Sequence, residues 1–204
     1  MRRLEGDTLV VASHNRGKID EIADLIRPYG LKVKAAPELG LTEPEETEET
    51  FVGNARIKAH AAAQASNLPA LADDSGIEVE ALGGAPGVHT ADWAETPQGR
   101  DFVMAMTRTW AELEAANAPE PRRASFCCTL VIAWPDGHDE VFEGRMPGRI
   151  TWPMRGDQGH GYDPIFQPEG FDITFGQMDR WQKNRISHRA RAFAAFEAGC
   201  LARR

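Results

Sequence analysis

The sequence predicts an α/β fold in which helices flank a mixed central sheet. Thr8–Ala12 is a β-branched, apolar run of strand length, and isoleucines follow it at helical spacing as far as Ile26. Ala124–Trp134 and Glu140–Gly144 flank the turn sequence Pro-Asp-Gly, which predicts a β-hairpin. Apolar residues recur at helical spacing after Ser187, so we expect a helix to the C-terminus with Ser187 as its N-cap.

The length of 204 residues fits one compact domain spanning residues 1–204, with residues 1–7 as a loose N-terminal extension. Hydrophobic residues make up 42% of the chain, and no apolar run approaches the roughly 20 residues that span a bilayer. No apolar signal segment follows Arg2 and Arg3. We therefore expect a soluble, cytoplasmic protein without a membrane partner.

Charge and cysteine content argue against several classes of protein. The formal net charge is −8, from 23 Lys and Arg against 31 Asp and Glu, which disfavours a generic nucleic-acid-binding surface. The three cysteines, Cys127, Cys128 and Cys200, match neither a disulfide framework nor a zinc spacing, so we expect buried free thiols. Any phosphate group must therefore bind in a local pocket.

The segment Ser13–Lys18 connects the first predicted strand to the first predicted helix. It places hydroxyl, amide, glycine and ammonium groups where the helix amides are unpaired and the helix dipole is positive, as an anion-binding loop does. It is not a Walker A loop, because the first glycine is missing and Ile19 follows the lysine. A plain helix cap explains the segment equally well.

An acidic segment, residues 43–49, precedes the next predicted helix. Asn54 and Lys58 stand four residues apart on that helix and so share one face. Acidic residues before a helix are stabilised by its dipole, which makes a solvated capping surface one explanation. The alternative is that Glu45 or Glu46 binds a hard cation.

The stretch Leu71–Gly76 brings Asp73, Asp74, a hydroxyl and a glycine together behind a short apolar run. It is predicted either as the edge of an active site or as an ordinary strand-to-turn transition, since Asp, Ser and Gly are common turn residues. Apolar residues at every second position over 76–82 predict that the strand resumes past the turn.

Three later segments have distinct patterns. An apolar stripe from Phe102 to Leu113 predicts an amphipathic helix whose face serves the core or a subunit interface. Gly156–Phe166 is a glycine-rich loop. In Lys183–Arg191, cations in the first turn of the C-terminal helix oppose the helix dipole by roughly 0.3–1 kcal/mol each. A bound anion or an electron-rich ligand would remove that conflict, whereas a solvated basic surface would tolerate it.

Together these segments supply the groups that a metal-bound nucleotide needs. Mg²⁺ takes oxygen ligands and bridges one or two carboxylates to substrate phosphates, a role for Asp74 with Glu45 or Glu46. Hydrolysis then requires an oriented water and charge neutralisation more than a covalent nucleophile.

The chain also resembles a known family, the inosine/xanthosine triphosphate pyrophosphatases, from Leu9 to Phe196. Six ordered motifs at family-like spacing carry the resemblance. They are Ser13–Lys18, Glu45–Thr47 with Phe51–Ala59, Leu71–Gly76, Leu82–Val88, Gly161–Phe166 and Lys183–Arg189.

The resemblance implies two lobes around a nucleotide-binding cleft, a homodimer, and Mg²⁺-dependent hydrolysis of ITP, dITP and XTP to the monophosphate and pyrophosphate, which cleanses the nucleotide pool. It implies that Asp74 is the general base and a metal ligand with Glu45 or Glu46, and that Asp73 supports the site. The implied nucleotide contacts are Ser13, His14, Asn15, Arg16, Gly17, Lys18, Asn54, Lys58, Ser75, His160, Gly161, Tyr162, Asp163, Lys183, His188 and Arg189.

The base preference has a physical rationale. A 6-oxopurine offers a donor at N1 and an acceptor at O6, which Asp163 and Arg189 can satisfy, whereas adenine reverses both groups. A site built on such hydrogen bonds rejects the wrong base by roughly 10⁴–10⁵-fold. No residue identifies what excludes GTP.

Two positions depart from the family pattern. His160 stands where the family often has a base-stacking phenylalanine, and His14 replaces a small or amide residue. A histidine can still stack on a base and adds a titratable ring.

Two other functions remain open at the level of sequence. One is a phosphomonoesterase with Asp73 as covalent nucleophile, although its usual second Asp, two residues on, is Ser75 here. The other is a nucleotide sensor without turnover.

Overall fold

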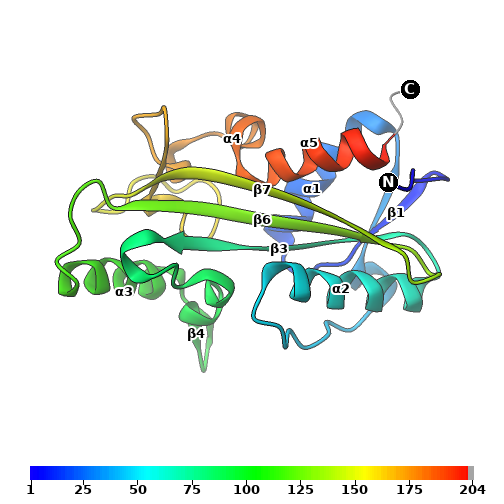
Figure 1. Ribbon diagram of the computed structural model, residues 1–204, viewed down its shortest axis with the longest axis horizontal. Helices are drawn as coiled ribbons and strands as arrows, with labels where there is room; N and C mark the ends of the chain where they lie inside the picture. The colour runs from blue at the N-terminus through cyan, green and yellow to red at the C-terminus, as the bar shows by residue number, and fades with distance from the viewer. Residues whose placement is uncertain (202–204) are drawn as a thin grey trace. The chain divides into compact units, whose positions relative to one another are not determined.

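A computed structural model describes residues 1–201, so the end of the predicted 1–204 domain lies outside the described residues. Its main sheet has six strands in the order β2-β1-β3-β6-β7-β8, and helices flank it (Figure 1). The predicted α/β fold with a mixed sheet is confirmed. The strands are β1 Thr8–Val11, β2 Lys32–Ala35, β3 Ala70–Val79, β4 Glu95–Thr96, β5 Gly99–Arg100, β6 Arg123–Ala133, β7 Asp139–Ile150 and β8 Phe166–Pro168. The α-helices are α1 Arg16–Ile26, α2 Phe51–Ser66, α3 Phe102–Ala115, α4 Arg180–Ile186 and α5 His188–Cys200.

Strand pairing makes the sheet mixed. β1 runs parallel to both β2 and β3, with Val11 opposite Leu71, as expected where helices connect the strands. β7 and β8 are antiparallel, and the short strands β4 and β5 form a separate antiparallel pair. The predicted hairpin joins β6 to β7, and its turn is closed by hydrogen bonds from Trp134 N to His138 O and from Gly137 N to Trp134 O.

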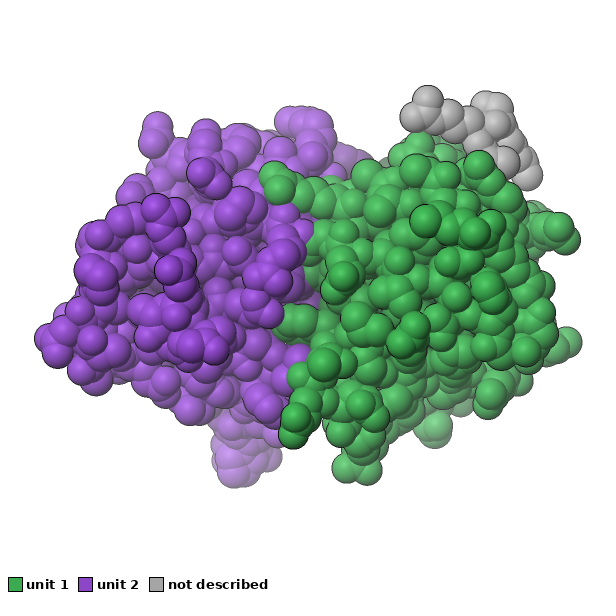
Figure 2. Space-filling model, in the orientation of Figure 1, with its two compact units in different colours: residues 1–74, 128–144, 189–204 green, residues 75–127, 145–188 purple. Residues whose placement is uncertain are grey.

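The chain divides into two compact units (Figure 2). Unit 1 contains residues 1–74, 128–144 and 189 onward, and unit 2 contains residues 75–127 and 145–188. Strands β3, β6 and β7 each have residues in both units. The predicted nucleotide-binding cleft and the single functional domain stay predictions.

The core of unit 1 has two layers because side chains alternate along each strand. On β1, Leu9 and Val11 pack with α1 and α5, whereas Val10 packs with the alanines of α2. On β6, Leu130 and Val131 divide in the same way between the two layers. Short alanine side chains on both sides of the second layer bring α2 close to the sheet. The sheet of unit 1 is therefore covered on both faces.

Unit 2 has one hydrophobic core, on one face of its part of the sheet. Met106 and Leu113 of α3 are buried in it, which places the predicted stripe in the core, with Phe102 and Trp110 packed at its edge. Phe126 of β6 lies in the same core.

The N-terminal residues contact the rest of unit 1. Leu4 N donates to Cys200 O over 2.8 Å, and Arg2 N donates to Glu140 Oε1 over 2.8 Å. The Arg2 guanidinium also lies over the Trp134 ring at 4.8 Å. No helix within residues 1–201 has both the length and the apolar character that crossing a membrane requires.

The prediction of a turn at Asp73–Gly76 is wrong. β3 runs without interruption from Ala70 to Val79, with both aspartates inside it. The two aspartates are accommodated inside the strand because a lysine pairs with each buried carboxylate. The predicted C-terminal helix is confirmed, because α5 begins at His188, directly after Ser187. The short helix α4 before it was not predicted; its N-cap is Asp179, whose side chain accepts from Gln182 N.

A pair of valines tests the two-layer core. Val131→Ala removes two methyl groups from a side chain with no exposed surface and should lower the free energy of unfolding by about 1–3 kcal/mol in urea titrations. Val103→Ala on α3 removes the same groups from a residue that is 59% exposed, and should change it by less than about 0.5 kcal/mol. Equal effects would contradict the assignment of Val131 to the core.

Candidate active site

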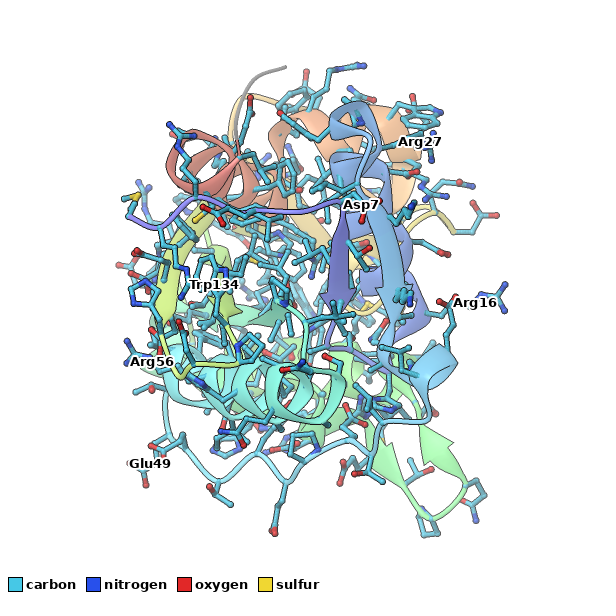
Figure 3. The ribbon with its side chains drawn as sticks, turned by 90° about the vertical axis from the view of Figure 1, so that its right-hand side faces the viewer. Asp7, Arg16, Arg27, Glu49, Arg56 and Trp134 are labelled. Atoms are coloured by element: carbon cyan, nitrogen blue, oxygen red, sulfur yellow. The ribbon has the colours of Figure 1, made fainter. Side chains whose placement is uncertain are left out.

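The segment Ser13–Lys18 forms a tight cap on α1. Asn15 is the N-cap and accepts from Lys18 N over 3.2 Å, and Ser13 Oγ accepts from Asn15 N over 3.1 Å. His14 Nε2 donates to the carbonyl oxygen of Leu41 over 2.8 Å. Arg16 and Gly17 lie in the first turn of α1, and the exposed Arg16 side chain extends from the surface (Figure 3). The capping function is thus present, and anion binding at this helix N-terminus stays a prediction.

Lys58 joins two carboxylates. It is 6% exposed, and its Nζ lies 2.7 Å from Glu46 Oε1 and 3.3 Å from Asp74 Oδ1. On the same face of α2, the buried Asn54 accepts from Glu48 N over 2.9 Å, which fixes the acidic segment against the helix. Of the two predicted metal ligands, both of which are exposed, Glu46 therefore shares a lysine with Asp74.

The two carboxylate oxygens of Asp74 differ in their hydrogen-bond partners. Its Oδ2 is buried and has no hydrogen-bond partner within residues 1–201. An unpaired buried oxygen is costly unless a ligand, a water or a cation reaches it. Burial raises the pKa of the Asp74 carboxyl above its ordinary value and outweighs the opposing field of Lys58.

Both carboxylate oxygens of Asp73, unlike those of Asp74, have cationic partners. The Asp73 side chain has no exposed surface, and Lys18 Nζ lies 2.7 Å from Oδ1 while Arg189 Nε lies 2.9 Å from Oδ2. Burial alone would raise the pKa of this carboxyl, but the charges of Arg189 and Lys18 outweigh it and hold the pKa well below its usual range. Asp73 therefore stays ionised and anchors two cations.

Arg189 is buried to 1% exposure at the start of α5. Its guanidinium pairs with Asp73 and also with Glu21 of α1. The cation that opposes the α5 dipole is thus compensated by carboxylates of the chain itself, an alternative that sequence reasoning missed. Glu21 lies three residues after Lys18, so the spacing indicates that both residues share one face of α1. No sequence pattern pairs Glu21 with Arg189, which is 168 positions away.

A second group of predicted residues gathers in unit 2. Lys183 Nζ lies 2.6 Å from Asp163 Oδ2, and both side chains are almost fully buried. The same oxygen accepts from His160 N over 2.9 Å. A side chain at Gly159, whose φ is +73°, would collide with this carboxylate, so the loop requires glycine there.

The other predicted residues of unit 2 occupy different environments. Tyr162 is 1% exposed and donates to Thr90 O over 3.1 Å, and burial raises the pKa of its phenol. His188 stacks on Phe126 with ring centroids 4.8 Å apart. Ser75 lies in β3, and Gly161 has a φ of +66°. Tyr162 thus supports the loop from inside the core.

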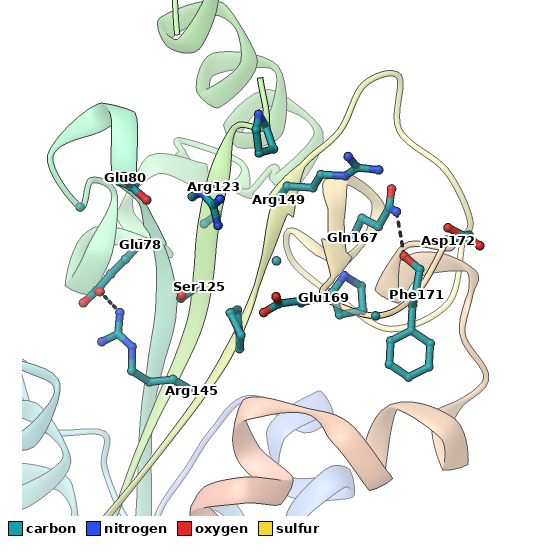
Figure 4. A pocket seen from close by; sticks show the side chains of 17 residues that line it. Glu78, Glu80, Arg123, Ser125, Arg145, Arg149, Gln167, Glu169, Phe171 and Asp172 are labelled. Atoms are coloured by element: carbon teal, nitrogen blue, oxygen red, sulfur yellow. Dashed lines mark hydrogen bonds and ion pairs between the residues drawn. The ribbon is translucent and has the colours of Figure 1, made fainter. Parts of the chain in front are cut away.

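Unit 2 also has a pocket of about 810 Å³ on the polar face of its part of the sheet (Figure 4). Arg123, Arg149 and Glu169 line it, together with an ion pair between Arg145 and Glu78. None of the predicted site residues lines this pocket.

Fold and site together define an α/β protein with a buried, lysine-paired carboxylate beside a capped helix N-terminus. The chain belongs to the Ham1 family, whose model matches residues 9–198. It is 66% identical to a dITP/XTP pyrophosphatase of Ruegeria pomeroyi over 200 residues, covering 98% of each chain, and 55% identical to a dITP/XTP pyrophosphatase of Agrobacterium fabrum, covering 98% of this chain and 99% of the relative. These matches confirm the predicted family.

Solved structures agree with this membership. A HAM1 protein from Coxiella burnetii superposes with a TM-score of 0.85 at 36% identity, covering 94% of this chain and 97% of the other. The Staphylococcus aureus Ham1 protein gives 0.81 at 35% identity with the same coverage.

The pKa of Asp73 leads to a pH-dependent prediction. Because its folded-state pKa lies below the ordinary value of about 3.9, ionised Asp73 stabilises the fold above that pH, and this contribution disappears as the pH falls toward the folded-state pKa. Asp73→Asn should therefore lower the free energy of unfolding by about 3–5 kcal/mol at pH 7. The difference from wild type should shrink below about pH 4 in urea titrations.

Asp20→Asn, the same change at an exposed position of α1, serves as the control and should stay within about 0.5 kcal/mol of wild type. A wild-type advantage over Asp73→Asn that is equally large at pH 3 and pH 7 would contradict the ionised state of Asp73.

Proposed function

We propose that this protein is a nucleoside triphosphate pyrophosphatase that hydrolyses dITP, ITP and XTP to the monophosphate and pyrophosphate, and so cleanses the nucleotide pool. The observation that carries the proposal is the buried Oδ2 of Asp74 beside Lys58, which has no hydrogen-bond partner in the described part of the chain, and the chain is 66% identical to a dITP/XTP pyrophosphatase. A carboxylate with a raised pKa and a spare oxygen is suited to accept a proton from water.

The residues of unit 1 have separate roles in this proposal. Asp74 Oδ2 takes the proton of the attacking water, while Lys58 holds Oδ1 and keeps the carboxylate oriented. Lys18, Ser13 and Asn15 at the α1 N-terminus bind the triphosphate. The anhydride bond between the α and β phosphates breaks, water adds across it, and pyrophosphate leaves. Positive charge offsets the negative charge that the phosphates carry in the transition state.

The donor set fits Mg²⁺. Within the described residues no three His, Cys, Asp or Glu side chains form a metal cluster, but Mg²⁺ needs only one or two carboxylates when substrate phosphates and waters complete its shell. Asp74 and Glu46, which share Lys58, are the proposed ligands. When bound, the ion would neutralise phosphate charge.

Base selection is assigned to Asp163, His160 and Arg189. Asp163 Oδ2 is occupied by Lys183 and by His160 N, so Oδ1 is the proposed acceptor for purine N1–H. Arg189, oriented by Asp73 and Glu21, is the proposed donor to O6. His160 is the proposed stacking partner of the base. Gly161, Tyr162, Ser75 and His188 complete the proposed nucleoside contacts, Tyr162 through loop support.

The proposal also includes a cytoplasmic location, and a homodimer, which the family resemblance implies. The net charge of −8 supports a small-molecule substrate over a nucleic acid, because a polyanion would be repelled.

Substrate selectivity tests the base-reading assignment. With Mg²⁺, purified protein should convert ITP, dITP and XTP at a kcat/KM about 10⁴-fold above that for ATP, because adenine reverses both hydrogen-bonding groups. Product analysis should find pyrophosphate, and EDTA should abolish turnover. Equal turnover of ATP would refute the base-reading assignment, and orthophosphate as the product would indicate a phosphomonoesterase.

The proton-acceptor role of Asp74 has its own test. Asp74→Asn should lower kcat for ITP by about 10²–10⁴-fold, because the amide cannot accept the water proton, while nucleotide affinity by calorimetry stays within a few-fold of wild type. Asp20→Asn is the control and should keep the wild-type kcat. Normal kcat in Asp74→Asn would show that another group accepts the proton.

A further inference from the structure

Cys128 is a member of the buried cluster that no motif identified. It lies on β6, the neighbour of β3 in the sheet, and is 1% exposed. Its Sγ donates to Asp73 Oδ2 over 3.0 Å, to the same oxygen that accepts from Arg189 Nε.

This thiol differs from the other donors to Asp73. Lys18 and Arg189 are long side chains from helices, with several rotatable bonds between backbone and charge. In Cys128 only one rotatable bond separates the backbone from the sulfur atom, and the residue lies on a strand next to β3. The position of its sulfur is therefore fixed by the sheet itself. A hydrogen bond from this position restricts rotation of the Asp73 carboxylate.

We propose that Cys128 is a positioning residue of the active site: its thiol fixes the carboxylate of Asp73, which in turn orients Lys18 toward the triphosphate and Arg189 toward the base. This inference rests on the proposed function for the roles of Lys18 and Arg189. One neutral hydrogen bond then supports the residues that bind both ends of the nucleotide.

The protonation state of the thiol is consistent with this role. Burial and the charge of Asp73 raise the pKa of Cys128 well above its ordinary value, so the group stays a donor at neutral pH. A thiolate would instead repel Asp73.

The neighbouring residue provides a matched control. Cys127 is also buried, at 4% exposure, but its Sγ lies 3.7 Å from the carbonyl oxygen of Ser125. It occupies the adjacent position of β6 and so points to the opposite face.

Three variants separate hydrogen bonding from packing. Cys128→Val keeps an apolar side chain of similar size but has no donor, and should lower kcat/KM for ITP by about tenfold, the usual effect of losing a hydrogen bond to a charged group. Cys128→Ser keeps the donor and should stay within about threefold of wild type. Cys127→Val should have wild-type activity.

A pure packing role predicts the reverse order, with Cys128→Val active and Cys128→Ser impaired, and that order would overturn the proposal. Equal kcat/KM values for the two Cys128 variants would also overturn it. Thermal unfolding of each variant, followed alongside, identifies any loss that comes from unfolding.

The S–H stretching band in the infrared tests the hydrogen bond without reference to activity. In Cys127→Ala/Cys200→Ala protein, where Cys128 is the remaining thiol, the folded-state band should lie at lower wavenumber than the band in urea. The shift should exceed that of Cys127 in Cys128→Ala/Cys200→Ala protein, because the acceptor of Cys127 is neutral and more distant.

Different results would overturn the proposed pyrophosphatase function and the inference about Cys128. A shifted Cys128 band with no ITP turnover in wild type would overturn the pyrophosphatase assignment, and with it the catalytic part of this inference. An active wild type whose Cys128 band is shifted no more than that of Cys127 would overturn the inference about Cys128 alone.

Discussion

The candidate site of unit 1 depends on the ion pairs that the buried carboxylate of Asp73 makes. This carboxylate contacts Lys18 at the N-terminus of α1, Arg189 at the start of α5 and Cys128 on β6. A lone carboxylate in this position would be protonated or excluded from the core, because burial strongly penalises its charge. Paired with two cations, it joins segments that lie far apart in the chain.

Adjacent residues of one strand have opposite properties for the same reason. Side chains alternate across β3, so Asp73 faces Lys18 and Arg189 while Asp74 faces Lys58 and Glu46. Two cations lower the pKa of Asp73, whereas burial dominates at Asp74 and raises its pKa. Two carboxylates whose environments push their pKa values apart are suited to different roles, Asp73 as an anchor for cations and Asp74 as the proposed proton acceptor.

Local pattern predicted much of the fold. Period-2 and helical spacing located β1, α1, α2, α3 and the β6–β7 hairpin, because these elements bury one stripe of apolar residues. The same reasoning failed at Asp73–Gly76, where turn-forming residues lie inside a strand. Local preference was overridden there by ion pairs with residues of other elements, which a single-sequence pattern does not contain.

The sequence by itself determined the chemical inventory of this protein: the six motifs, the family, and the residue types from which a magnesium and nucleotide site can be built. Only the tertiary structure decided how those groups are paired. It gave Arg189 the partners Asp73 and Glu21, 116 and 168 positions away, and placed Glu46 rather than Glu45 beside Lys58. The physical reason is that charge, burial and hydrogen bonding act through distance in space, and these distances exist only once the chain has folded.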